Sequence, residues 1–158
     1  MTTPLPFFQV DAFADGPFTG NPAAVMPLTE WLPDEVIQAI AAENNLSETA
    51  FTVPSGADTH DYDLRWFTPT VEVDLCGHAT LASGHVLIHG GKVRFSTRSG
   101  ILTVSQKDDL LLLDVPAAPL EERHEPELCG ALGLPDSPVW LATACNYAAI
   151  IEVADEAA

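Results

Sequence analysis

Basic residues are scarce in this sequence. Six lysines and arginines stand against 23 aspartates and glutamates, which gives a formal net charge of −17. A field of that sign repels the phosphates of nucleic acids and the headgroups of anionic lipids. We therefore expect no nucleic-acid partner and no docking on a membrane. One local pocket can still bind an anion through backbone N–H groups, because net charge says nothing about a single site.

Long apolar segments are also missing. No stretch approaches the roughly 20 consecutive apolar residues that a membrane-spanning helix requires. Residues 1–13 contain no basic segment followed by an apolar run, so they do not resemble an export signal. The three cysteines, Cys76, Cys129 and Cys145, are odd in number and lack metal-type spacing. We accordingly expect reduced thiols and a cytoplasmic location.

The common signatures of nucleotide, hydrolase and zinc sites are absent. The sequence has no G-x-G-x-x-G, no P-loop, no G-x-S-x-G elbow and no paired C-x-x-C. His85 and His89 are four residues apart on one face of a predicted helix, which is a spacing that can hold a metal ion. No third ligand follows at a recognisable spacing, and the helix dipole accounts better for His89 near the helix end. We expect no metal there.

Hydrophobic residues make up 47% of the sequence, which is enough for a buried core. Their spacing predicts many short strands and few helices. Helices are expected over residues 33–45, 78–89 and 127–132. Strands or strand-like runs are expected over residues 6–13, 23–26, 46–53, 62–67, 71–75, 92–97, 101–106, 110–115, 139–144 and 147–153.

The helix predicted over residues 78–89 is apolar on nearly every side. Its residues are small, and it has little polar surface beyond Thr80, Ser83 and His85. A helix of this kind has to be largely buried. Many short strands around one buried helix indicate an α+β fold, in which a mixed or antiparallel sheet wraps around a central helix.

The composition also divides the chain. Three prolines and several acidic residues between Pro116 and Pro126 are typical of a linker. We therefore expect a first lobe over residues 1–117, a linker over 118–126 and the truncated beginning of a second lobe over 127–158. Because the second lobe has barely begun where the sequence stops, we expect a fragment of a longer protein.

Glu48 is the first candidate for chemistry. It lies near the start of a predicted strand, between the apolar or small residues Leu46, Ala50 and Phe51. A carboxylate that is partly removed from water can act as a general acid at neutral pH. A solvated glutamate on an edge strand fits the same pattern, and spacing alone favours that interpretation.

The second candidate is the strand-to-helix junction over residues 74–80. Gly77 lets the backbone approach a ligand closely, and the N–H groups at the helix start form an anion site. His78 could bind a ligand or relay a proton, or it could satisfy a local carbonyl group. Cys76 could carry a proton if its thiol were acidic, although a small buried structural cysteine is the commoner outcome.

Four motifs occur in an order and spacing that resemble one family. Residues 7–13 and residues 18–25 resemble the two opening motifs of the phenazine-biosynthesis-like (PhzF-like) proteins, FFxVDAF and FxGNPAAV. Residues 45–51 are similar to the family's NLSETAF, and residues 65–82 are similar to its RxFTPxxEVxxCGHATLA. The resemblance covers residues 5–115, and the strands after Pro138 resemble the start of the family's second lobe.

This resemblance implies a diaminopimelate-epimerase-like fold, with two similar lobes and an active site between them. It implies that Glu48 moves a proton between carbons of a small, anionic substrate, without cofactor or metal, and that His78 assists. The best-known member isomerises trans-2,3-dihydro-3-hydroxyanthranilate, but most relatives have no assigned substrate. The residues implied to bind substrate are Gly77, Ser47, Asn21 and Cys76.

One family motif is missing. The second lobe carries a glycine-rich, GGDPATGSA-like motif opposite the catalytic glutamate, and the sequence ends before it. We expect the chain to form a homodimer or to pair with a missing carboxy-terminal segment. Two functions stay open: an isomerase, favoured by Glu48 and His78, and a non-catalytic small-molecule-binding or interaction domain, favoured by the missing motif. An epimerase that uses Cys76 as a thiol base is weaker, because no second pocket cysteine can be placed.

Overall fold

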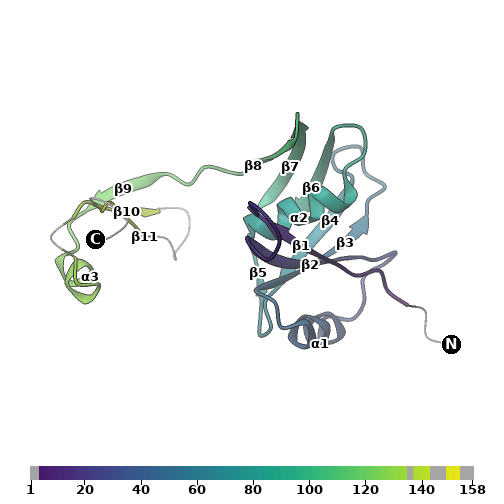
Figure 1. The fold of residues 1–158 in the computed structure, drawn as a ribbon, viewed down its shortest axis with the longest axis horizontal. Helices are drawn as coiled ribbons and strands as arrows, with labels where there is room; N and C mark the ends of the chain where they lie inside the picture. Colours follow the sequence, from purple (N-terminus) through teal and green to yellow (C-terminus); the bar gives the residue numbers. More distant parts are fainter. Residues whose placement is uncertain (1–3, 135–136, 143–148, 154–158) are drawn as a thin grey trace. The chain divides into compact units, whose positions relative to one another are not determined.

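A computed structural model describes residues 4–134, 137–142 and 149–153 (Figure 1). The chain divides into two compact units, Met1–Pro116 and Ala117–Ala158. In the first unit the helices are α1 (Asp34–Asn44) and α2 (Gly77–Leu87). Its strands are β1 (Phe8–Ala12), β2 (Asn21–Pro27), β3 (Glu48–Pro54), β4 (Tyr62–Phe67), β5 (Glu72–Val73), β6 (Lys92–Thr97), β7 (Gly100–Lys107) and β8 (Leu110–Asp114).

These strands form one mixed, eight-stranded sheet that curls around α2 (Figure 1). The strand order is β1-β2-β3-β4-β6-β7-β8, with β5 paired to β4. The pairs β2–β3 and β4–β6 are parallel, and the other pairs are antiparallel. Helix α2 contacts β1 and β8, which are the two edge strands, as well as strands between them. The prediction of an α+β fold with a sheet around a central helix is confirmed.

Small residues allow α2 to lie against the sheet. Ala79 and Ala82 are completely or almost completely buried, and so are the polar residues Thr80 and Ser83. At Gly84, an added Cβ would lie only 2.5 Å from a methyl carbon of Val104 on β7. The sequence-based prediction of a buried helix is therefore confirmed.

The helix ends earlier than the sequence predicts. Helix α2 stops at Leu87, and Ile88 already has extended backbone angles, although its N–H still bonds to the carbonyl of Gly84. His89 forms an isolated antiparallel bridge with Lys92, across the turn at Gly90. The pairing that starts the next strand therefore ends the helix, and hydrophobic periodicity does not detect this.

Helix α1 covers the opposite face of the sheet. Its Ile37 and Ala41 pack with Met26, Phe51 and Phe67 in a second apolar cluster, separate from the one around α2. Asn45 ends α1 in the left-handed conformation, which asparagine tolerates better than most residues. The chain then needs only two residues to enter β3, so α1 and its cap fix where β3 begins.

The second unit contains a small antiparallel sheet in the order β11-β10-β9. Its elements are β9 (Leu120–Arg123), α3 (Pro126–Ala131), β10 (Val139–Ala142) and β11 (Ala149–Ile151). The expected linker over 118–126 thus contains a strand, because its prolines flank β9 and do not interrupt it. Cys145 and parts of the strands expected over 139–144 and 147–153 lie outside the described residues.

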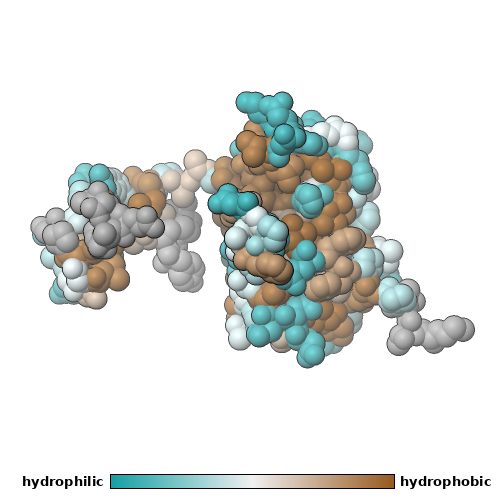
Figure 2. Space-filling view, viewed as in Figure 1, coloured by the Kyte–Doolittle hydropathy of each residue, from teal (hydrophilic) through white to brown (hydrophobic). Residues whose placement is uncertain are grey.

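Large hydrophobic side chains remain exposed on the first unit. On the face shown in Figure 2, hydrophobic residues form broad areas between the polar ones. Exposed examples include Leu110 and Leu112 on β8 and Ile101 on β7. None of the helices in the described ranges has the length and apolar character needed to cross a membrane.

We expect Gly84→Ala to destabilise the first unit. The new methyl group would meet Val104 within van der Waals radii, and overpacking of this kind costs about 1–3 kcal/mol. Gly130→Ala in α3 is a matched control, because an added Cβ there meets nothing within 4 Å. Chemical denaturation should show a lower free energy of unfolding for Gly84→Ala and an unchanged one for Gly130→Ala. Equal stability of the two variants would contradict this account of the core.

Candidate active site

Glu48 is the first residue of β3. Strand β3 runs parallel to β2 with Glu48 opposite Ala23, and Thr49 is opposite Phe67 on the antiparallel β4. The carboxylate therefore extends from an inner strand of the sheet and not from an edge. Its side chain is only 20% exposed, so Glu48 is not the solvated edge-strand glutamate that spacing alone favoured.

Cys76 and His78 lie at the start of α2. Cys76 is the residue before the helix and is buried, and His78 belongs to the first helical turn with a side chain that is 11% exposed. The carbonyl of Cys76 accepts hydrogen bonds from the backbone N–H and the hydroxyl group of Thr80. These bonds tie the junction to the first turn of the helix and hold both side chains on the side that faces β3.

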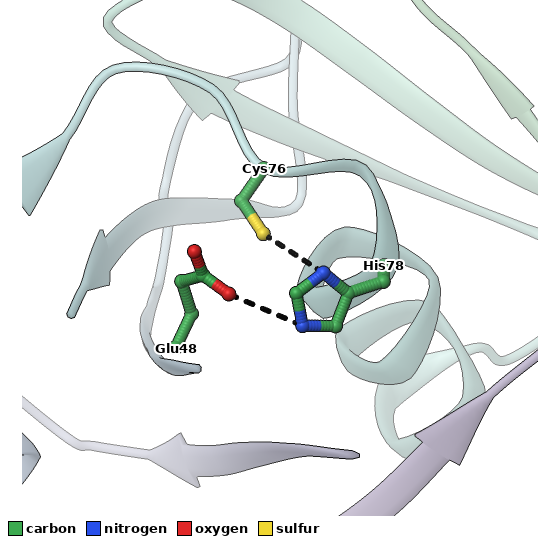
Figure 3. Close-up of side chains that lie close together, drawn as sticks. All are labelled: Glu48, Cys76 and His78. Atoms are coloured by element: carbon green, nitrogen blue, oxygen red, sulfur yellow. Dashed lines mark hydrogen bonds and ion pairs between the residues drawn. The ribbon is translucent and has the colours of Figure 1, made fainter. Parts of the chain in front are cut away.

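The three side chains point toward one another (Figure 3). Nε2 of His78 lies 3.2 Å from Oε2 of Glu48, and Nδ1 of His78 lies 3.4 Å from Sγ of Cys76. The first pair of atoms is close but does not form a hydrogen bond: both atoms are buried, and neither has a hydrogen-bond partner among the described residues. Buried polar groups are normally satisfied, so this pair has bonding capacity left for a ligand.

The thiol of Cys76 is not a base at neutral pH. Burial raises its pKa to about 12, the nearby charge of Glu48 adds to the rise, and the backbone N–H of Ala79 opposes it. In the tautomer in which the protonated thiol donates to Nδ1 of His78, the ring proton is on Nε2. This result argues against the epimerase in which Cys76 is a thiolate base.

The cluster contains three types of side chain that bind metal ions, with donor atoms within 4.8 Å of one another. However, Sγ faces Nδ1 of the imidazole ring, and the carboxylate faces Nε2 (Figure 3). An ion on either ring nitrogen would have one further side chain beside it, and the third side chain would lie by the other nitrogen of the ring. The arrangement therefore fits a chain of proton donors and acceptors better than a metal centre.

The other predicted site residues lie near this group without contacting it through hydrogen bonds. Gly77 is exposed at the start of α2, where an added Cβ would meet only a methyl group of Leu113, at 4.0 Å. Ser47 is exposed directly before Glu48, and Asn21 is half-buried at the same end of the neighbouring strand β2. No described hydrogen bond joins Ser47 or Asn21 to the cluster. Their role in substrate binding stays a prediction.

A hollow of about 420 Å³ lies elsewhere on the first unit. It is lined by Ala12 at the end of β1 and the following Phe13, by Leu81 and His85 of α2 and by Leu110 of β8, among others. None of Glu48, Cys76 and His78 lines it. The hollow therefore lies along the helix between the two sheet edges and is separate from the cluster.

Sequence reasoning missed a group of ion pairs beside the junction. Glu72 of β5 accepts hydrogen bonds from Arg65 at 2.7 and 2.8 Å and from Arg98 at 2.6 Å. Arg65 also bonds to Asp34 at the start of α1, and its guanidinium lies over the rings of Trp31 and Phe67. The contacts of Arg98 with Glu72 and of Arg65 with Asp34 join residues 26 and 31 positions apart, so no local spacing could have revealed them.

A curled sheet around a small-residue helix, with a carboxylate and an imidazole at the helix start, defines an epimerase-like α+β lobe. The sequence profile described as phenazine biosynthesis-like protein matches residues 10–154. The chain belongs to the phenazine-biosynthesis-like protein family.

Individual relatives agree with this assignment. An uncharacterised isomerase of Pseudomonas aeruginosa is 59% identical over 141 residues, which cover 85% of this chain and 53% of the relative. A crystal structure of a PhzF-family protein from Enterococcus faecalis matches with a TM-score of 0.82 and 43% identity, over 97% of this chain and 58% of that one. A predicted epimerase from P. aeruginosa, at 21% identity, shares the fold, with a TM-score of 0.64 over 85% of this chain and 55% of that one. The chain spans about half the length of the curated relatives it matches.

We expect Cys76 to react slowly with iodoacetamide. With a pKa of about 12, its thiolate fraction at pH 8 is about 10³-fold below that of an ordinary thiol. Peptide mass spectrometry should show slow modification whose rate rises with pH and has no plateau up to pH 10. In urea the rate should approach that of a free cysteine. A plateau near pH 8 in the folded protein would contradict the assignment of a protonated thiol.

Proposed function

We propose that this chain forms one side of a cofactor-independent isomerase site, in which Glu48 moves a proton between carbons of a small anionic substrate. The observation that carries the proposal is the buried pair of Glu48 and His78. Its facing atoms lie 3.2 Å apart and have no hydrogen-bond partner in the part of the chain that the structure describes. Such a pair is costly to keep unless a ligand completes its bonding.

Each group has a role that follows from its position. Glu48, partly shielded from water, accepts a proton from one carbon as a carboxylate and returns it to another carbon as a carboxylic acid. His78, with its ring proton on Nε2, donates a hydrogen bond into the same space. The backbone N–H groups and the dipole at the start of α2 favour a negatively charged substrate group there. Gly77 leaves room for that group, because an added Cβ there would have no neighbour closer than 4.0 Å.

The names of relatives support the class of reaction. One of the most similar relatives is named an uncharacterised isomerase, and a structural neighbour is named a predicted epimerase. Both kinds of reaction move a proton to and from carbon. We propose that a second lobe, of the kind found in the longer relatives, covers the Glu48–His78 pair and completes the pocket.

A second candidate function is a non-catalytic small-molecule-binding or interaction domain. The observation that favours it is that the unsatisfied atoms of Glu48 and His78 can hold a polar small molecule without any transfer of a proton. The two candidates differ in one measurable property. The isomerase exchanges a substrate hydrogen with solvent, and the binding domain retains ligand without exchange.

We expect Glu48→Gln to abolish exchange of substrate hydrogen with solvent. The probe is trans-2,3-dihydro-3-hydroxyanthranilate in D₂O, with deuterium incorporation followed by mass spectrometry. Loss of a general acid/base lowers the rate by about 10²–10⁴-fold, and the amide keeps the shape of the side chain. Glu43→Gln is the control, because Glu43 is exposed on α1 and should leave the rate unchanged.

The outcome separates the two candidates. Exchange by the unmutated chain that is lost only in Glu48→Gln supports the isomerase. Exchange at the unmutated rate in Glu48→Gln would show that the glutamate mechanism is wrong. Binding of the probe with no exchange in any variant, even after a carboxy-terminal segment of a longer relative is added, would favour the binding domain.

We also propose that the chain associates, either as a homodimer or with a carboxy-terminal segment of the kind found in longer relatives. Exposed hydrophobic residues on β8, such as Leu110 and Leu112, and Ile150 on β11 favour burial against a partner. Sedimentation velocity at micromolar concentration should show a dimer, or a stable complex when a carboxy-terminal segment of a longer relative is added. A monodisperse monomer that does not bind such a segment would contradict association.

A further inference from the structure

The loop that carries Cys76 into α2 has little support of its own. It follows β5, which has only two residues and pairs only through Val73 with Trp66 and Glu72 with Phe67. Asp74 is exposed. No side chain caps the start of α2. Thr80 and burial hold Cys76 itself, but the exposed residues Asp74 and Leu75 before it would move readily unless another element held them.

The turn between β6 and β7 supplies that support. Ser99 donates a hydrogen bond of 2.8 Å to the backbone carbonyl of Asp74. Arg98 bonds to Glu72 at 2.6 Å and to the Asp74 carboxylate at 3.4 Å. The turn is itself ordered, because the Thr97 hydroxyl group donates to the carbonyl of Gly100 and accepts from the N–H of Ser99. An ordered turn of the sheet therefore holds both the strand before the loop and the loop itself.

The charges of Arg98 show why it positions the loop and does not bind an anionic substrate. Its guanidinium faces Glu72 and Asp74, whose carboxylates neutralise it. Glu72 is 13% exposed and is shared with Arg65, whereas Arg98 is 55% exposed. With its charge already compensated, Arg98 offers little attraction to a further anion.

We propose that Arg98 and Ser99 are positioning residues that fix the loop over residues 74–76 and thereby the orientation of Cys76 and His78. The inference rests on the proposed function, because it concerns how the Glu48–His78 pair is held. Cys76 follows Asp74 by two residues, and its Sγ lies 3.4 Å from Nδ1 of His78. If the Asp74 carbonyl moves, Cys76 moves with it, and the contact between Sγ of Cys76 and Nδ1 of His78 that orients the imidazole ring changes.

The double variant Arg98→Gln/Ser99→Ala tests this role without removing the fold. Glu72 keeps both hydrogen bonds from Arg65, so no buried carboxylate is left without a partner. Arg94→Gln is the matched control. Arg94 lies on β6, just before the turn that carries Arg98, and it forms a partly buried ion pair with Asp61 at 3.0 Å.

Two readouts report on the site without any substrate. The first is the pair of imidazole ¹⁵N signals of His78, assigned with His78→Gln. The second is the alkylation rate of Cys76, followed by peptide mass spectrometry with Cys129 as an internal reference. In the double variant the His78 signals should shift, and Cys76 should react about tenfold faster, as expected for losing one ion pair and one hydrogen bond. Arg94→Gln should leave both readouts unchanged.

Rescue distinguishes positioning from general stability. Arg98→Lys keeps the charge, and Ser99→Thr keeps the hydroxyl group. The double variant Arg98→Lys/Ser99→Thr should therefore give His78 signals close to those of the unmutated protein, in contrast to Arg98→Gln/Ser99→Ala. Unchanged His78 signals in the double variant, or equal changes in Arg94→Gln, would overturn the proposal. Because no substrate is involved, a failed exchange test with Glu48→Gln would overturn the proposed reaction and leave the positioning role standing.

Discussion

The close contact between α2 and the curled sheet is the constraint on which the rest of the first unit depends. A helix can be enclosed by strands on several sides only if its own side chains are small, and Gly84 against Val104 shows how little room remains. The same contact fixes the axis of α2 and therefore the point where its first turn meets β3. The position of His78 beside Glu48 is thus a result of core packing.

Burial and bonding at the cluster combine in an unusual way. The facing atoms of Glu48 and His78 are hidden from water and find no hydrogen-bond partner among the residues described, whereas Cys76 is kept protonated by burial. Nearby, Glu72 has three charged hydrogen bonds from two arginines. The unit therefore places its satisfied charges around the junction and leaves unsatisfied polar atoms at its centre, as expected for a ligand site.

Sequence reasoning predicted the elements whose cause is local. Pro33 and Asn45 bound α1, and the small residues of α2 indicated its burial. It failed where contacts outside the local segment determine the secondary structure. The bridge between His89 and Lys92 ends α2 early. Pairing with β10 makes β9 a strand within the expected linker. At the site, motifs singled out Glu48, Cys76 and His78, which the structure brings together. Arg98 and Ser99 went unnoticed, because their partners lie about 25 residues away.

The contact of α2 with both β1 and β8 also bears on how the protein folds. β1 lies near the amino terminus and β8 follows α2, so the helix is enclosed only when segments roughly 100 residues apart have met. Sheets with such high contact order form slowly, since the entropy of loop closure is lost before the packing is gained. Glu48 and His78 therefore meet late in folding, and a nascent chain that lacks β8 has their sequence but not yet their arrangement.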